Sequence, residues 1–190
     1  MSAFLAPIHY NMFNKILNQD DINQDLLRAF GNEELSDQVR IEVGALPKGE
    51  LETIIDHGNI HGWLQSQIDV VESSFSLIVD SLLNMGISKE QLIEWFNERG
   101  KAAGSVEGGE DIFRTFTNSF LDGMPCDRAI QPIELSDDTA KWVQNADVHG
   151  KYWSDGGITY NELRCAWING LAENNGFAFG FDQGVYEVSK

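Results

Sequence analysis

Positive charge is scarce in this sequence. Thirteen Lys and Arg residues stand against thirty Asp and Glu residues, which gives a formal net charge of -17 at pH 7. The cations are scattered singly and form no basic stripe. Because nucleic acids and anionic membrane surfaces are bound by clustered positive charge, the composition predicts no nucleic-acid partner and no membrane partner.

Long apolar runs and cysteine pairs are also lacking. No segment approaches the roughly 18 apolar residues of a transmembrane helix, and the N-terminus has no basic stretch followed by an apolar one. The two cysteines, Cys126 and Cys165, lie far apart without CxxC spacing, so neither a disulfide framework nor a zinc ribbon is supported. We therefore expect a soluble cytoplasmic protein with reduced thiols.

Helical periodicity dominates the chain up to Gly123. The strongest pattern runs from Ile60 to Met85, where apolar residues recur every three or four positions and predict a helix of about 26 residues ended by Gly86. Shorter patterns predict further helices near residues 6–17, 22–30, 33–43, 51–55 and 110–121, and one opened by a capping box at Ser88. This part reads as a bundle of four or more helices.

The pattern changes after Gly123. Residues 130–135 and 139–143 fit short strands, and Pro132 restricts the first of them to a sheet edge. Thr159 and Glu162 have capping-box spacing and open one more helix, while the tail FAFGFDQGVYEV predicts a terminal hairpin. The expected fold class is mainly α: a multi-helix bundle over residues 1–123 with a small C-terminal α+β subdomain over residues 124–190 packed on it.

Histidines supply the first candidate site. At 100° per residue, His61 and Glu72 fall within about 20° of each other on the long helix, and His57 precedes His61 by one turn. His9 falls on the apolar face of the first helix. Imidazoles four residues apart can share one metal ion, and a carboxylate can complete the site. The sequence thus predicts that His9, His57, His61 and Glu72 hold a divalent transition metal, with Gln65 as a polar partner.

An alternative to the metal site remains open for the histidines. His9 and His61 also fit hydrogen-bonded core or boundary histidines, and His57 fits a surface residue, because the Glu-x-x-His and HExxH motifs are missing.

A second constellation pairs Cys126 and Asp127 with the segment Asp147–His149, in which an imidazole would activate a thiol and a carboxylate would orient the ring. That pairing would make the protein a Cys-His enzyme.

Aromatic residues are dense in the C-terminal third. Such rings either line a pocket for a planar or apolar ligand or fill the core of a small subdomain, and the core reading is favoured. The residues concerned are Trp142, Tyr152, Trp153, Tyr160 and Trp167.

Several strings carry a resemblance. IHGWLQ, GMPCD, DVHGKYW and YNELRCAWINGL, which begin at Ile60, Gly123, Asp147 and Tyr160, look like those of a group of uncharacterised proteins from anaerobic, largely clostridial bacteria. This likeness implies a bacterial cytoplasmic origin and assigns no catalytic residue. The string NIHGWLQSQIDVVE also resembles the helices of DinB-like metal-binding bundles, although Gln67 stands where that family places a metal-binding histidine.

Three hypotheses for function follow. The first is a protein that binds a metal ion or small ligand in the helical bundle. The second is a non-catalytic interaction or structural module, and the third is the Cys-His enzyme. Self-association through apolar residues that the short helices leave uncovered is compatible with each of them.

Overall fold

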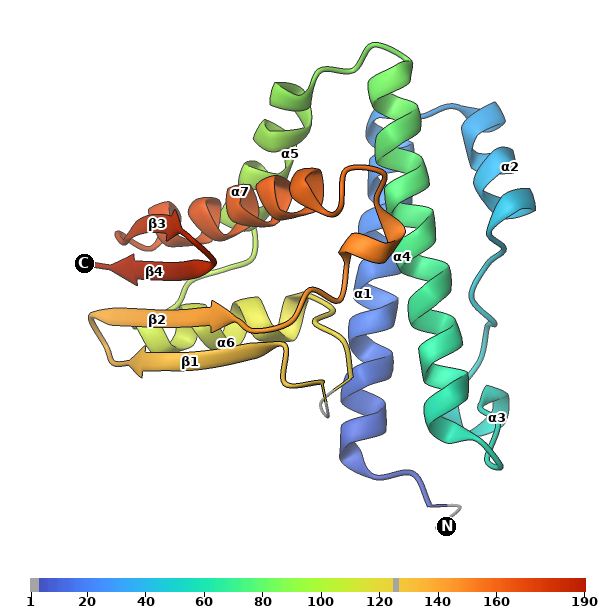
Figure 1. Ribbon diagram of the computed structural model, residues 1–190, viewed down its shortest axis with the longest axis horizontal. Helices are drawn as coiled ribbons and strands as arrows, with labels where there is room; N and C mark the ends of the chain where they lie inside the picture. The colour runs from blue at the N-terminus through green and yellow to red at the C-terminus, as the bar shows by residue number, and fades with distance from the viewer. Residues whose placement is uncertain (1–3, 125–126) are drawn as a thin grey trace. The chain divides into compact units, whose positions relative to one another are not determined.

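The computed structural model describes residues 4–124 and 127–190 (Figure 1). Seven α-helices and one four-stranded antiparallel sheet are present in these residues, and the sheet belongs to the C-terminal part. The predicted fold class, mainly α with a small C-terminal α+β part, is therefore confirmed. No helix of the described ranges is long and apolar enough to cross a membrane.

The chain divides into two compact units. The first, here called the helical unit, comprises residues 1–86 and 119–124, and the second, the mixed unit, comprises residues 87–118 and 125–190. This division differs from the predicted one at residue 123. Two helices of residues 87–118 group with the sheet instead of with the preceding helices, because they pack against it and its helix, as described below.

Four helices build the helical unit, with bounds α1 Pro7–Phe30, α2 Glu33–Glu42, α3 Leu51–Ile54 and α4 Ile60–Asn84. Helices α1 and α4 lie side by side and run in the same direction (Figure 1). The long predicted helix is confirmed as α4. The predicted break between residues 17 and 22 is wrong, since α1 continues through it without a glycine or proline to stop it.

Buried amides explain why α1 continues. Gln19 and Asn23 are each 1% exposed; Gln19 Nε2 donates to Asn23 Oδ1 at 3.1 Å, and Asn23 Nδ2 donates to the backbone oxygen of Val71 at 2.9 Å. Polar residues in the middle of the helix thus face α4, and Asn23 joins the two helices by its hydrogen bond to Val71. Around them lies an apolar core made by Met12, Phe13, Ile16, Leu51, Ile55, Leu64, Ile68, Val71 and Leu121.

The mixed unit contains three helices and four strands, with bounds α5 Lys89–Lys101, α6 Gly109–Ser119, β1 Ile130–Leu135, β2 Thr139–Gln144, α7 Ile158–Asn174, β3 Ala178–Asp182 and β4 Val185–Ser189. The strand order is β1-β2-β4-β3, with every pair antiparallel. Strand β1 lies at the edge, as Pro132 predicted. The terminal hairpin is also confirmed, with positive φ at Gln183 and Gly184 in its two-residue turn.

Stacked side chains form the core of the mixed unit. The rings of Trp142 and Tyr186 lie 5.5 Å apart and nearly parallel, and Phe116 of α6 stacks on Trp142 at 5.3 Å. The guanidinium of Arg164, a residue that is 1% exposed, lies 4.6 Å above the ring of Phe116. A cation over an aromatic face is attracted by the ring quadrupole. This arrangement lets α7 bury an arginine against the sheet.

Helices α5 and α7 approach each other unusually closely. A Cβ atom added to Gly170 would lie 1.9 Å from the backbone oxygen of Asn97, and one added to Gly100 would lie 2.0 Å from the backbone oxygen of Trp167. The two backbones are therefore in contact at these glycines. Gly100 is accordingly a buried residue of α5.

Candidate functional site

His9 and His61 are the predicted site residues that the structure brings together. Their ring centroids lie 5.5 Å apart with the planes tilted by 58°. Both residues belong to first helical turns, His9 in α1 and His61 in α4. The proximity arises because α1 and α4 run parallel and begin at the same end of the helical unit (Figure 1).

The ring of His9 already serves the start of α1. Its Nδ1 accepts the backbone N–H of Ala6 at 3.0 Å. A neutral imidazole that accepts at Nδ1 carries its proton on Nε2, so neither nitrogen offers a lone pair to a metal in this arrangement. His9 therefore acts as a capping residue, a role that matches the hydrogen-bonded boundary histidine among the sequence alternatives.

The prediction that His61 faces inward is wrong. His61 is exposed, although Leu64 and Ile68, which follow it on the same helix, are buried. Angular position decides which way a side chain points, but burial also needs a neighbouring element at that height. At the first turn of α4 that cover is missing from the described helical unit.

His57 and Glu72 lie apart from this pair. His57 follows α3 outside any helix, and its Nε2 is 2.9 Å from the backbone oxygen of Glu52. Glu72 is buried in α4 eleven residues after His61, which corresponds to about 16 Å along the helix axis. Within residues 4–124 and 127–190, no group of three or more His, Cys, Asp and Glu side chains is arranged to hold a metal ion.

Glu52 instead makes a polar contact with α1. Tyr10 donates its hydroxyl to Glu52 Oε1 at 2.6 Å. This hydrogen bond raises the pKa of Tyr10 above its ordinary value and lowers the pKa of Glu52. Glu52 is exposed and Tyr10 is half-buried, so the contact positions α3 against α1 without burying a charge.

The Cys-His constellation falls partly outside the described residues, because Cys126 is not among them. Asp147 Oδ1 accepts the backbone N–H groups of His149 and Gly150, at 3.0 and 2.8 Å. The His149 ring is buried and stacks on Tyr160 with centroids 3.8 Å apart. Asp147 therefore shapes a turn through backbone N–H groups, and the Cys-His pairing stays a prediction.

Cys165, the other cysteine, is not activated either. Burial raises its pKa to about 12, outweighing the lowering effect of Arg164. A thiol with such a pKa stays protonated near neutral pH, and the thiolate is the nucleophilic form.

A pocket of about 600 Å³ lies within the mixed unit. Four segments wall it: the end of β2, the loop containing Asp147 and His149, the first turns of α7, and the hairpin of β3 and β4. A second hollow of about 650 Å³ is lined by residues of β2, β3 and β4 and by Gln183 of the hairpin turn, and the Lys141–Glu187 ion pair lies on it. The first is the better candidate site, because concave sites with converging polar groups and aromatic walls are typical of ligand binding.

Amide side chains converge on a tyrosine hydroxyl in this pocket. Tyr186 donates to Asn161 Oδ1, and its hydroxyl oxygen is also 3.3 Å from Gln144 Oε1. Gln144 in turn accepts from Arg164 at 3.5 Å and donates to the backbone oxygen of Ala146 at 3.2 Å. The orientation of both amides is thus set by neighbouring groups of the fold.

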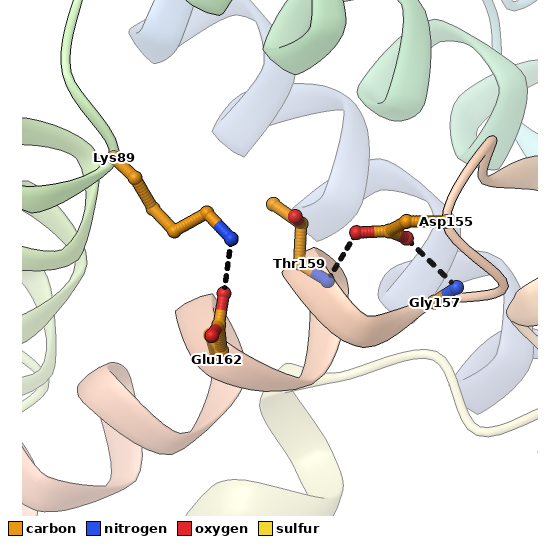
Figure 2. A network of polar contacts seen from close by, with 5 residues as sticks. All are labelled: Lys89, Asp155, Gly157, Thr159 and Glu162. Atoms are coloured by element: carbon orange, nitrogen blue, oxygen red, sulfur yellow. Dashed lines mark hydrogen bonds and ion pairs between the residues drawn. The ribbon is translucent and has the colours of Figure 1, made fainter.

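A glycine-rich turn places the first residues of α7 at the pocket. Gly156 and Gly157 have φ values of 71° and 86°, which favour glycine. Figure 2 shows the carboxylate of Asp155 accepting the backbone N–H of Gly157 at 3.0 Å and of Thr159 at 2.8 Å. Partial burial raises the pKa of Asp155, but these hydrogen bonds outweigh it and hold the pKa below its ordinary value.

The predicted capping box at Thr159 is wrong for this reason. Asp155 does the capping, and Thr159 lies inside α7. Glu162 is consequently free of the capping role and pairs with Lys89 of α5, with Nζ 2.7 Å from Oε2 (Figure 2). The hydrogen bond to Glu162 raises the pKa of Lys89. The capping box at Ser88 is confirmed by reciprocal hydrogen bonds with Gln91.

Sequence reasoning missed most of this pocket. The aromatic residues of this region were predicted to line a pocket or to fill the core. Tyr160 lines the pocket, whereas Trp142, Trp153 and Trp167 are buried. Gln144, Asn161 and Tyr186 carry no recognisable motif, because they come from β2, α7 and β4. The available signal was Asp155 followed by two glycines directly before the start of α7, whose first turn contains Tyr160.

Comparison of the chain with protein-family models, with curated proteins and with solved structures finds no match. The resemblances to clostridial proteins and to DinB-like bundles therefore stay predictions, and the site rests on its geometry.

Proposed function

We propose that this protein binds a small organic molecule in the pocket of the mixed unit. The observation that carries the proposal is the amide and tyrosine group of Gln144, Asn161 and Tyr186 at a pocket of about 600 Å³. That volume lies within the range of small-molecule sites, which combine apolar walls with a few oriented polar groups. The small-ligand hypothesis is thus moved from the helical bundle to the C-terminal part.

The proposal is for binding, without an assigned reaction. Cys165 is a protonated thiol at the pocket, and Asp147 is bound to backbone N–H groups. Neither residue is prepared to act as a nucleophile or base. Metal binding at His9 and His61 is less well supported, because the capping bond to Ala6 occupies His9.

The expected setting of this binding protein is the bacterial cytoplasm, with no nucleic-acid partner. The support is the net charge of -17 and the wide spacing of the two cysteines. Self-association stays a prediction as well. Ile133 on the edge strand β1 is 58% exposed and would favour it, whereas the irregular register between Pro132 and Glu134 disfavours strand pairing at that edge.

The test is a fragment titration of the ¹⁵N-labelled full chain, using a mixture of neutral, cationic and anionic ring compounds. We expect chemical-shift changes clustered at the pocket residues for at least one class. Ile158 lines the pocket and is 62% exposed, so Ile158→Trp adds bulk at the pocket with little risk to folding. This variant should weaken binding by roughly tenfold, or about 1.4 kcal/mol.

The matched control is Ile41→Trp, at an isoleucine of α2 in the helical unit that is 76% exposed. It should bind like the unmodified chain. If no fragment changes the pocket resonances, or if Ile158→Trp and Ile41→Trp bind alike, the proposed function is wrong.

A further inference from the structure

Asn161 presents hydrogen-bond donors to the pocket. Its Oδ1 is held by the hydroxyl of Tyr186, which fixes which end of the amide faces the protein. Its Nδ2, by contrast, makes no hydrogen bond within the described residues, although an amide nitrogen carries two N–H donors. Because Asn161 lines the pocket, these donors are available to an acceptor atom of a ligand.

Charge around the pocket disfavours anions. The charged residues that line it are Asp147 and Glu162, both acidic, and no Lys or Arg is among the described lining residues. Arg164 lies nearby, but it is 1% exposed and directs its NH1 towards Gln144. The chain as a whole carries a net charge of -17. Glu162 is paired with Lys89 of α5, which leaves Asp147 as the lining carboxylate outside that ion pair. A phosphate or carboxylate ligand would therefore meet the charge of Asp147 and no Lys or Arg among the described lining residues.

Aromatic residues line the same space, and Phe181 is the exposed one among the four named here. His149 and Tyr160 form a stacked pair, and Phe181, which is 42% exposed, leans on Tyr186 with centroids 4.6 Å apart. All four residues line the pocket. Rings of this kind favour contact with another planar ring over contact with a flexible chain.

We propose that the pocket selects an uncharged planar ring compound that carries a carbonyl acceptor, such as an aromatic carboxamide, and that Asn161 Nδ2 donates to that carbonyl. The corresponding carboxylate is disfavoured, since its charge meets Asp147 and no Lys or Arg among the described lining residues. This inference rests on the proposed function, because it names the ligand class of the same pocket. Asn161 is its specificity-determining residue.

A matched pair of probes tests the ligand class. Nicotinamide and nicotinate share one ring and differ in the carboxamide or carboxylate group, so their affinities at pH 7 compare the two chemistries directly. Titration of the ¹⁵N-labelled full chain should give at least about tenfold tighter binding of nicotinamide, with shifts at Asn161 and Tyr186. Equal or tighter binding of nicotinate would overturn the inference while leaving the proposed function intact.

A matched pair of variants tests the residue. Asn161→Asp keeps an oxygen that accepts from Tyr186 but removes both N–H donors, and it should reduce the affinity for nicotinamide by about tenfold. Asn145→Asp adds the same charge to the same pocket, where the Asn145 amide is already engaged with Gln131 at 2.9 Å. That variant should retain binding, and equal losses in both would overturn the role of Asn161.

The remaining outcomes separate the two proposals. If other fragments bind in the pocket and neither nicotinamide nor nicotinate does, the carboxamide preference is wrong and small-molecule binding stands. If no fragment of any charge binds there, both proposals fail together.

Discussion

The two units of this protein bring helices together by different means. In the helical unit, α1 and α4 are joined through side chains, an apolar core with the buried amides Gln19 and Asn23. In the mixed unit, α5 and α7 touch through their backbones at Gly100 and Gly170. A contact between side chains, as in α1 and α4, tolerates changes of side-chain size by local repacking. A contact between backbones, as in α5 and α7, leaves no space for an added side-chain atom.

The largest effect should come from filling the backbone contact. Gly170→Ala places a methyl group 1.9 Å from the backbone oxygen of Asn97, and we expect a loss of about 3 kcal/mol in the free energy of unfolding. The sign of this change in the free energy of unfolding is informative, because Gly→Ala inside a helix otherwise stabilises a protein by about 1 kcal/mol. Chemical denaturation measures the loss, and amide hydrogen exchange should place it in the mixed unit.

Gly180→Ala is the control for this change. Gly180 is a residue of β3 with open space around the added atom, and its substitution should leave stability almost unchanged. Comparable stabilities of the Gly170→Ala and Gly180→Ala proteins would remove the contrast between the two units.

A smaller effect is expected from the amides of the helical unit. Asn23→Ala removes the donor to Val71 and leaves Gln19 Nε2 without its acceptor in a buried site, which should cost about 2 kcal/mol. Denaturation of this variant should be compared with that of Asn14→Ala, since Asn14 is an exposed residue of the same helix. Equal stabilities for these two would mean that the buried amides do not hold α1 against α4.

The smallest effect concerns the start of α7. Asp155→Ala should cost about 1 kcal/mol, because two backbone N–H groups lose their acceptor. The folded pKa of Asp155 is lowered, so its contribution is present above the ordinary carboxyl pKa and is lost as the pH falls through the lowered value. Unfolding curves at neutral and acid pH should show the cost of Asp155→Ala at neutral pH only.

Asp182→Ala supplies the reference for the pH dependence. Asp182 is an exposed residue at the end of β3, and its removal should change stability little at either pH. A cost for Asp155→Ala that persists unchanged at pH 2 would show that its carboxylate does not cap α7.

Elements with strong local signals were predicted well. The period of apolar residues located α4, the Ser88 capping box located α5, and the Asp182–Gly184 turn located the terminal hairpin. Each of these signals depends on residues close together in the chain, where backbone geometry and hydrogen bonding are local. The error at residues 17–22 arose because α1 carries buried polar residues such as Gln19, and the error at Thr159 arose because Asp155 caps α7.

The candidate site was predicted poorly for a related reason. The angular argument placed His9 and His61 in one site of the bundle core, and their rings do lie 5.5 Å apart, although His61 is exposed. It did not place His57 or Glu72 beside them, because a helical projection carries no information on distance along the axis. The pocket of the mixed unit depends on residues from separate strands and a helix, which no spacing rule connects.

By itself, the sequence determined the fold class, the acidic character of the chain, the long helix α4 and the edge position of β1. The period of apolar residues and the geometry of proline are local properties, and composition is a plain count, so all three can be read without knowledge of the fold. Only the tertiary structure decided that Gly100 and Gly170 meet, that His61 is exposed, and that Asn161 and Tyr186 share a pocket. Those outcomes depend on which distant segments pack together, and that is fixed by the shape of the whole core.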